Sequence, residues 1–158
     1  MPVRTLSSGS NIEFATLGIG EVITRYRLRV PLHQRQYAWT EKEVREFFTD
    51  IGGAIQKAAY FLGTIVLTGG SESAVKDVSD GQQRLATTVI LLSAIRDYYH
   101  KAGEMNRVKS IENSFLFTYD DDTAELEPKL TLNSDDNHFF GSAILPSPED
   151  RADQISPK

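Results

Sequence analysis

Cysteine is absent from the 158 residues of the chain. This absence excludes disulfide bonds, thiolate-bound metals and a cysteine nucleophile, and it is typical of proteins in a reducing cytoplasm. Long hydrophobic runs are absent too, because the apolar stretches at residues 60–67 and 85–95 are too short or too interrupted to span a membrane. The N-terminus lacks the apolar core and cleavage site of a secretory signal. We therefore expect a cytoplasmic protein without a membrane span.

Hydrophobic residues make up 40% of the sequence, which is enough for one domain with a core of ordinary size. We expect this domain to occupy residues 15–142. A disordered lead-in over residues 1–14 precedes it, and a disordered tail over residues 143–158, with its Pro, Ser and charged residues, follows it. Because the helical pattern breaks off just before this tail, we expect the sequence to be part of a larger protein.

Acidic residues are concentrated near the C-terminus, and the net charge of the chain is −5. Residues 112–158 hold 11 of the 22 Asp and Glu residues but only 3 of the 17 Lys and Arg residues. In contrast, Arg25, Arg27, Arg29 and Arg35 lie in one short segment without acids. Such a patch can meet phosphates even on an acidic protein. For the arginine run alone, a solvated strand face is the favoured interpretation.

The first half of the chain contains a clear strand pattern and a clear helix start. Residues 26–30 alternate apolar and basic side chains, as in a half-buried strand. Thr40 and Glu43 have the spacing of a capping box that opens a helix. Gly52 and Gly53 predict a kink or an early end of this helix. Its predicted apolar stripe consists of Val44, Phe47, Phe48, Ile51 and Ile55.

A β-hairpin and a long helix are predicted in the second half. Residues 60–68 form a β-branched, apolar run typical of a buried strand, and residues 74–79 follow as its hairpin partner. From Gly81 to near Gly103, apolar residues recur with helical spacing. Further along, we expect a helix over residues 106–117, a turn at 120–122 and a strand at 129–132. Residues 134–136, Ser-Asp-Asp, are the expected cap of a short helix through Phe140.

Residues 80–85, Asp-Gly-Gln-Gln-Arg-Leu, lie between a predicted strand and the start of the long helix. A helix N-terminus offers free N–H groups to an anion, and Gly81 allows a phosphate to approach the main chain. Arg84 can add a bidentate contact to phosphate oxygens. Gln82 and Gln83 can orient a water molecule or a base, since an amide both donates and accepts.

Asp80 is the unusual member of this motif, because a carboxylate beside a phosphate repels it unless a cation intervenes. A bound Mg²⁺ would resolve the repulsion. On position alone, the more conservative role is an N-cap, with Gln83 closing the capping box. For Arg84 taken by itself, the conservative interpretation is a surface arginine of the helix. The two roles of Asp80 are compatible with each other.

A second motif, residues 30–39, places the polar pair Gln34-Arg35 among aromatic side chains. Arginine next to Tyr37 and Trp39 is the composition of a site that grips a phosphate and stacks against a base. The alternative is that the two aromatic residues only staple the following helix, and for Trp39 that alternative is favoured. For Gln34 and Arg35 the functional interpretation is favoured.

The two motifs together resemble the family of GmrSD restriction endonuclease N-terminal domains. The signatures of that family are a Pro-x-x-Gln-Arg-x-Tyr-x-Trp segment and a later Asp-Gly-Gln-Gln-Arg-Leu segment, and both occur here in that order. The resemblance covers residues 15–140. His33 stands where the family commonly has an aromatic residue, and Ala86 where it often has threonine.

The resemblance implies an α+β fold with a small mixed β-sheet and packed helices, similar to the ParB and sulfiredoxin type. Relatives resemble NTP-hydrolysing sensors of type IV or phosphorothioation-linked DNA restriction and phage defence, and a C-terminal HNH-type nuclease domain or subunit is expected as partner. The three histidines of this chain, His33, His100 and His138, are too widely spaced for an HNH site. Nuclease activity is therefore not expected from these residues.

Two functional hypotheses follow from the motifs and the resemblance, a weak NTPase without a P-loop and a binding module for modified DNA without turnover. A third possibility is a regulatory scaffold in which the motifs are structural. For the NTPase, the expected catalytic residues are Asp80, Gln82, Gln83 and Arg84, with Asp80 holding Mg²⁺. The expected phosphate cradle consists of Gln34, Arg35, Gly81 and Arg84. The expected DNA contacts are His33, Gln34, Arg35, Tyr37 and Trp39.

Overall fold

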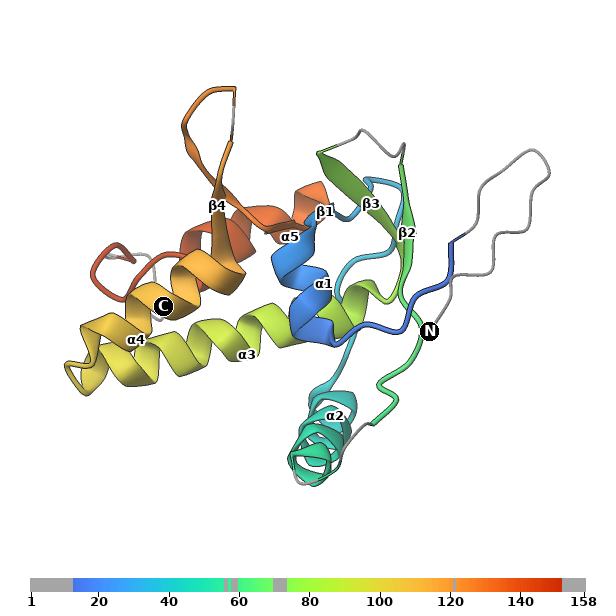
Figure 1. Cartoon of the computed structure of the whole chain (residues 1–158), viewed down its shortest axis with the longest axis horizontal. Helices are drawn as coiled ribbons and strands as arrows, with labels where there is room; N and C mark the ends of the chain where they lie inside the picture. Colours follow the sequence, from blue (N-terminus) through green and yellow to red (C-terminus); the bar gives the residue numbers. More distant parts are fainter. Residues whose placement is uncertain (1–12, 56, 58–59, 70–73, 121, 152–158) are drawn as a thin grey trace.

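The computed structural model combines short strands with helices and describes residues 13–55, 57, 60–69, 74–120 and 122–151 (Figure 1). The elements up to the long helix are α1 (Ile19–Arg25), β1 (Arg27–Arg29), α2 (Glu41–Ala54), β2 (Val66–Thr68), β3 (Val75–Asp80) and α3 (Gln82–Lys101). They are followed by α4 (Met105–Ile111), a π-helical turn (Glu112–Leu116), β4 (Phe117–Tyr119), β5 (Leu126–Pro128), β6 (Leu130–Thr131), α5 (Ser134–Phe139) and a second π-helical turn (Phe140–Ile144).

The main sheet is mixed, with the strand order β2-β3-β1-β6. β1 is parallel to both neighbours, so that Leu28 lies opposite Lys76 on one side and Leu130 on the other. β2 and β3 are antiparallel, as the predicted hairpin requires. The expected α+β class with a small mixed sheet is therefore confirmed, while the closer likeness to ParB and sulfiredoxin stays a prediction.

The hydrophobic core lies between this sheet and α3, the long helix that runs below it in Figure 1. Leu85 and Val89 of α3 are buried together with Leu28 and Val78 of the sheet, and α1 adds Ile23. Burying each of these side chains contributes on the order of 1.5–3 kcal/mol, which fixes the start of α3 relative to β1 and β3. The predicted helix from Gly81 to near Gly103 is confirmed.

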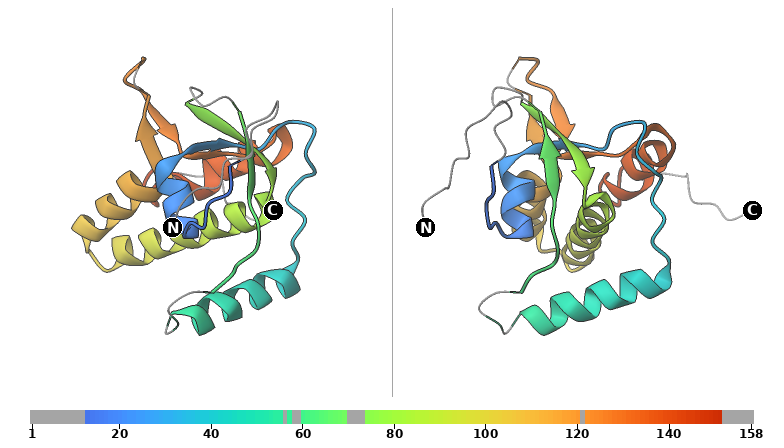
Figure 2. Two further views of the ribbon diagram at one scale, coloured as in Figure 1. Left: turned by 45° about the vertical axis from the view of Figure 1, so that its right-hand side comes forward. Right: turned by 90° about the vertical axis from the view of Figure 1, so that its right-hand side faces the viewer.

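α2 forms as predicted but does not face the core. Thr40 and Glu43 make the expected capping box, and the helix continues through the two glycines to Ala54. Phe47 is its only buried residue, and no described α2 residue belongs to the core cluster. Figure 2 shows α2 lying apart from the other elements in both views. The predicted apolar stripe is therefore partly solvent-exposed, with Phe48 45% and Ile55 79% exposed.

The segment expected as a buried strand over residues 60–68 is only partly a strand. Only β2, its last three residues, pairs with β3. The preceding residues 60–65 have no regular secondary structure, and Phe61 is 80% exposed. The prediction of a buried strand over the whole run was wrong because hydrophobic composition alone does not reveal whether a neighbouring strand is available.

The C-terminal part of the described chain is held by a helix cap and by buried apolar side chains. The N-cap of α5 is Asn133, the residue before the expected cap at residues 134–136, and its Oδ1 accepts from the amide of Asp136 at 3.2 Å. Beyond residue 142, where the domain was expected to end, Ala143 and Leu145 are buried. The folded part thus extends past the expected boundary. Residues 152–158 of the expected tail and residues 1–12 of the expected lead-in lie outside the described residues.

Arg96 explains why the chain after residue 142 is held in place. Its guanidinium is fully buried and donates to the carbonyl oxygens of Ile144, Leu145 and Pro146. Two carboxylates, those of Asp97 and Glu112, balance its charge at 2.7 and 3.0 Å. A buried charge must be paired and hydrogen-bonded, so this cluster ties the C-terminal segment to α3.

Among the described helices, none is both long and apolar enough to cross a membrane.

Candidate functional site

The two sequence motifs meet in space at the start of α3. There a pocket of about 430 Å³ opens between the loop that follows β1 and the end of β3. It is lined by Gln34, Arg35, Trp39, Ser79, Asp80, Gly81, Gln82, Gln83 and Arg84. Every predicted phosphate-binding residue and every predicted catalytic residue therefore borders one cavity, although their two segments lie about 45 residues apart in the sequence.

Gly81 is the N-cap of α3 and has a left-handed conformation, with φ of 89°. A Cβ atom here would lie 2.9 Å from Ile65 Cγ1 and 3.3 Å from the carbonyl oxygen of Thr64. Both the backbone angle and the crowding therefore require glycine. Among the described residues no side chain caps the helix, so neither Asp80 as N-cap nor Gln83 as its capping-box partner is realised. The first-turn amides of α3 are left without a side-chain cap, as an anion site requires.

Gln83 binds the main chain of the first motif. Its Oε1 accepts from the amides of Ala38 at 2.8 Å and Trp39 at 3.3 Å, and its Nε2 donates to the carbonyl of Gln36 at 3.1 Å. The side chain is buried, and its amide oxygen is occupied by two donors. Gln83 thus positions the loop that lines the pocket.

Gln82 also binds the main chain of the first motif, but only through its amide nitrogen. Its Nε2 donates to the carbonyl of Arg35 at 3.0 Å. Its Oε1 is buried and has no hydrogen-bond partner among the described residues. A buried acceptor without a donor is costly, so this oxygen is available to a water molecule or to a donor on a ligand.

Arg84 lies between the pocket and residues 60–65. Its Nη1 donates to the carbonyl of Leu62 at 3.0 Å, and its Nη2 is 4.0 Å from the carboxylate of Asp80. Gly63 allows this approach, since a Cβ atom there would lie 1.7 Å from Nη1. An arginine carries five N–H donors, so most of those of Arg84 are not used by these contacts.

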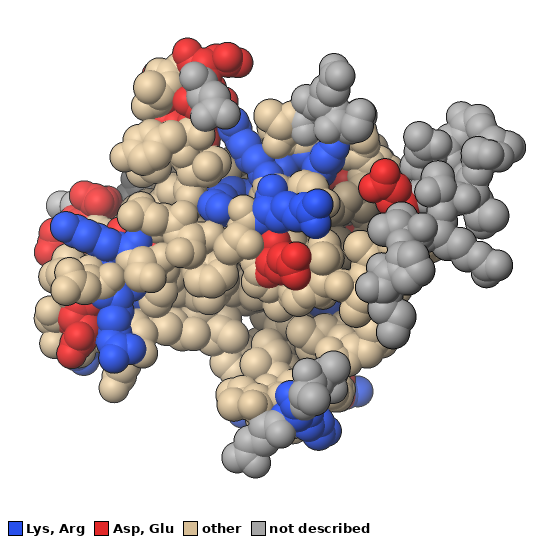
Figure 3. All heavy atoms as spheres, in the orientation of Figure 1, with Lys and Arg blue, Asp and Glu red and all other residues tan. Residues whose placement is uncertain are grey.

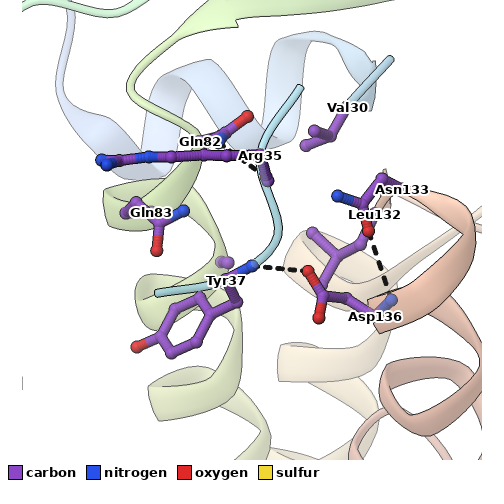
Figure 4. A pocket seen from close by; sticks show the side chains of 9 residues that line it. Val30, Arg35, Tyr37, Gln82, Gln83, Leu132, Asn133 and Asp136 are labelled. Carbon is purple, nitrogen blue, oxygen red and sulfur yellow. Dashed lines mark hydrogen bonds between the residues drawn. The ribbon is translucent and has the colours of Figure 1, made fainter. Parts of the chain in front are cut away.

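The guanidinium of Arg35 is exposed, and no hydrogen bond or ion pair joins it to any described residue. Figure 4 shows its side chain extending past Gln82 and Gln83 across the first turn of α3. A second cation thus reaches the uncapped helix start. Arg35 and Arg84 together give the pocket the charge that an anionic ligand needs.

The aromatic residues of the first motif have different surroundings. Trp39 lines the pocket and packs edge-on against Phe47 of α2, with 5.3 Å between ring centroids, so it does staple α2 as the conservative interpretation predicts. Tyr37 instead borders a neighbouring cavity of about 10 Å³, the size of one water molecule, and its hydroxyl bonds Thr87 at 2.9 Å. His33 is exposed and lines neither cavity.

Asp80 is the carboxylate that borders the pocket, and its side chain is 66% exposed. Within the described ranges, no group of three or more His, Cys, Asp or Glu side chains gathers as a metal centre would need. A Mg²⁺ ion at Asp80 would therefore take its remaining ligands from water and from ligand phosphates, as Mg²⁺ commonly does.

Three of the four clustered arginines belong to a different surface. Figure 3 shows basic side chains gathered over α1 and β1. Arg27 is paired with Asp120 at 2.8 Å and with Glu127 at 3.2 Å, and Arg29 with Asp77 at 2.7 Å. Hydrogen bonding to Arg29 lowers the pKa of Asp77. Much of this positive charge is thus neutralised locally, which agrees with the solvated strand face favoured for the run.

Sequence patterns missed several residues that shape the pocket. The strand predicted over residues 60–68 includes Gly63, and an isolated glycine in a strand pattern signals a close approach of another group. Asn133 and Asp136 hold the outer side of the pocket loop, through the carbonyl of Gln34 at 3.2 Å and the amide of Tyr37 at 2.6 Å. Figure 4 shows Asp136 beside that loop, opposite α3. The expected cap at residues 134–136 predicted the helix but neither the N-cap Asn133 nor these two contacts.

A family model described as GmrSD restriction endonuclease, N-terminal domain, matches residues 19–157. The matched range includes all residues that line the pocket. This confirms the resemblance that the two motifs predict. No curated protein matches the chain.

Proposed function

The chain belongs to the family of GmrSD restriction endonuclease N-terminal domains, and on that premise we propose that its pocket binds and slowly hydrolyses a nucleoside triphosphate. In this role the domain is the sensor of a modification-dependent DNA restriction system, with the nuclease supplied by an HNH-type domain or subunit. The observation that supports the proposal is the convergence of Arg35, Arg84 and the uncapped start of α3 on one cavity of about 430 Å³.

The residues are suited to binding phosphates. The N-terminus of a helix of 20 residues carries a partial positive charge and free N–H groups, and two guanidinium groups border it. Gly81 presents no side chain that would block access to the main chain. Trp39 borders the same pocket and offers an aromatic surface to a base.

In hydrolysis a water molecule attacks the γ-phosphorus atom. The bond between this phosphorus atom and the β,γ-bridging oxygen breaks, which gives a nucleoside diphosphate and inorganic phosphate. Positioning and charge stabilisation supply most of the rate enhancement in such reactions. Arg84 and Arg35 would stabilise the phosphate charge, and the carboxylate of Asp80 would hold Mg²⁺. For orienting the water, Gln82 is better suited than Gln83, because its amide oxygen lacks a partner among the described residues.

The test is a phosphate-release assay with GTP, ATP and CTP, with and without duplex DNA carrying phosphorothioate linkages or modified bases. Arg35→Ala should weaken nucleotide binding by at least tenfold, because a hydrogen bond to a charged group contributes about 1.5–3 kcal/mol. Arg25→Ala removes an exposed arginine outside the pocket and is the matched control. Equal affinities of Arg35→Ala and the unmodified chain for all three nucleotides would refute the proposal.

A non-catalytic module that binds modified DNA is the second candidate. It is favoured by the engagement of Gln83 with the main chain and by the lone carboxylate at the pocket. In that case the loop residues His33, Gln34, Arg35, Tyr37 and Trp39 would contact DNA. Affinity would fall steeply between 50 and 200 mM salt, on the order of a thousandfold for several phosphate contacts, whereas a compact nucleotide site is less sensitive. Slow phosphate release that modified DNA accelerates would exclude this candidate.

A further inference from the structure

Consecutive side chains at the start of α3 hold both of the segments that connect α2 to the rest of the domain. We call residues 31–40, which lead into α2, the first linker, and residues 60–65, which lead from α2 toward β2, the second linker. Gln82 and Gln83 bind the first linker through main-chain atoms. Arg84 binds the second linker through the carbonyl of Leu62 at 3.0 Å.

These contacts matter because little else fixes the position of α2. No described α2 residue belongs to the hydrophobic core cluster, and the one buried side chain of α2, Phe47, packs against Trp39, which is itself part of the first linker. In both views of Figure 2, α2 lies apart from the sheet and α3. The orientation of α2 is therefore set mainly by its two linkers.

Arg84 is shared between the second linker and the pocket. Its guanidinium is in contact with Leu62 and Gly63, and it also lines the cavity in which the proposed nucleotide would lie. Arg84 is 22% exposed and its distance to the Asp80 carboxylate, 4.0 Å, is too long for a hydrogen bond. A phosphate oxygen is a stronger acceptor for a guanidinium than a neutral carbonyl.

We infer that α2 is a ligand-responsive arm: a phosphate-bearing ligand that draws the guanidinium of Arg84 into the pocket releases the second linker and lets α2 change its orientation relative to α3. The first linker, held by Gln83, remains attached and acts as the pivot. This inference rests on the proposed nucleotide site and adds its regulation, since occupancy of the pocket becomes visible as a movement of α2 at the protein surface.

The inference is tested by measuring the distance between α2 and α3. Because the chain has no cysteine, Thr49→Cys on α2 and Lys101→Cys at the end of α3, both exposed, provide unique sites for two spin labels. Pulsed electron paramagnetic resonance then gives the distance distribution. Without ligand we expect one narrow maximum, and with saturating GTP and Mg²⁺ a second maximum at a different distance.

Variants separate the step at Arg84 from other effects. Arg84→Ala should show the altered distribution without any nucleotide, because the second linker is no longer held. Arg25→Ala, outside the pocket, should behave as the unmodified chain. Circular dichroism of each variant checks that it is folded, and isothermal titration calorimetry checks nucleotide binding independently of movement.

The outcomes distinguish this inference from the function on which it rests. Saturating GTP that binds without changing the distance distribution overturns the movement of α2 and leaves the nucleotide site intact. An Arg84→Ala variant that is folded and keeps the narrow maximum also overturns it. Failure of GTP, ATP and CTP to bind at all overturns the proposed function and the ligand-driven release together.

Discussion

Replacing Gln83 by methionine isolates the hydrogen bonds that join the two motifs. Methionine has nearly the length of glutamine and fills the same buried space, but it cannot replace the contacts to Gln36, Ala38 and Trp39. Two of these have good lengths, 2.8 and 3.1 Å, and the third is longer at 3.3 Å. At about 1 kcal/mol for each good hydrogen bond, the free energy of unfolding should fall by about 2–3 kcal/mol.

Urea denaturation followed by the fluorescence of Trp39, the single tryptophan of the chain, measures this loss. The midpoint should shift to lower urea while the slope stays unchanged, because the surface exposed on unfolding is the same. Arg45→Ala is a suitable control, since it removes an exposed ion pair with Glu41 and should cost no more than about 0.5 kcal/mol. A Gln83→Met variant as stable as this control would show that the amide does not hold the loop in solution.

Three other changes test separate parts of the structure. Arg96→Leu leaves the carbonyl of Leu145 without its donor and the carboxylate of Glu112 without its partner, so it should lower the free energy of unfolding by about 3–5 kcal/mol. The melting temperature should fall on the order of 10 °C, and an unchanged melting temperature would contradict the described cluster. Gly63→Ala, strained by φ of 112° and by the crowding of its Cβ, should lower the urea midpoint, whereas Gly52→Ala, with open space around its Cβ, should raise stability by about 0.5–1 kcal/mol. Hydrogen bonds lower the pKa of Asp77 and of Asp120 in the folded protein, so both carboxylates stabilise the fold above about pH 4. This stabilisation is lost as the pH falls through their lowered pKa values. The urea midpoint should therefore decrease from about pH 6 to pH 2, and it should decrease less steeply for Asp120→Asn.

Elements with strong local signals could be predicted from the sequence. The start of α2 was predicted because a capping box needs only the pair Thr40 and Glu43, and α3 because its apolar spacing extends over five turns. α1 and the β4–β5 hairpin were not predicted, since their short lengths give little periodicity and their stability comes from packing on distant residues. The exposure of Tyr60 and Phe61 was missed for a similar reason.

The candidate site shows the same division between local and distant information. The residue types of both motifs indicated an anion site, and the pocket brings them together. A local pattern does not reveal which groups the side-chain amides of Gln82 and Gln83 bind. Both bind main-chain atoms about 45 residues away in the sequence. The two motifs therefore contained most of the residues that line the pocket, but Ser79 was not predicted, and His33 and Tyr37 lie outside its lining. The roles of the two glutamines in supporting the loop required coordinates.

The parallel pairing of β1 has a consequence for how the chain folds during synthesis. β1 is made early, yet its neighbours are residues 75–77 and residues 130–131. An emerging chain cannot complete the centre of its sheet until the last of these leaves the ribosome, and contacts between distant segments form slowly. Until then β1 lacks both strand neighbours, so the nascent domain exposes the unpaired backbone edges of this strand.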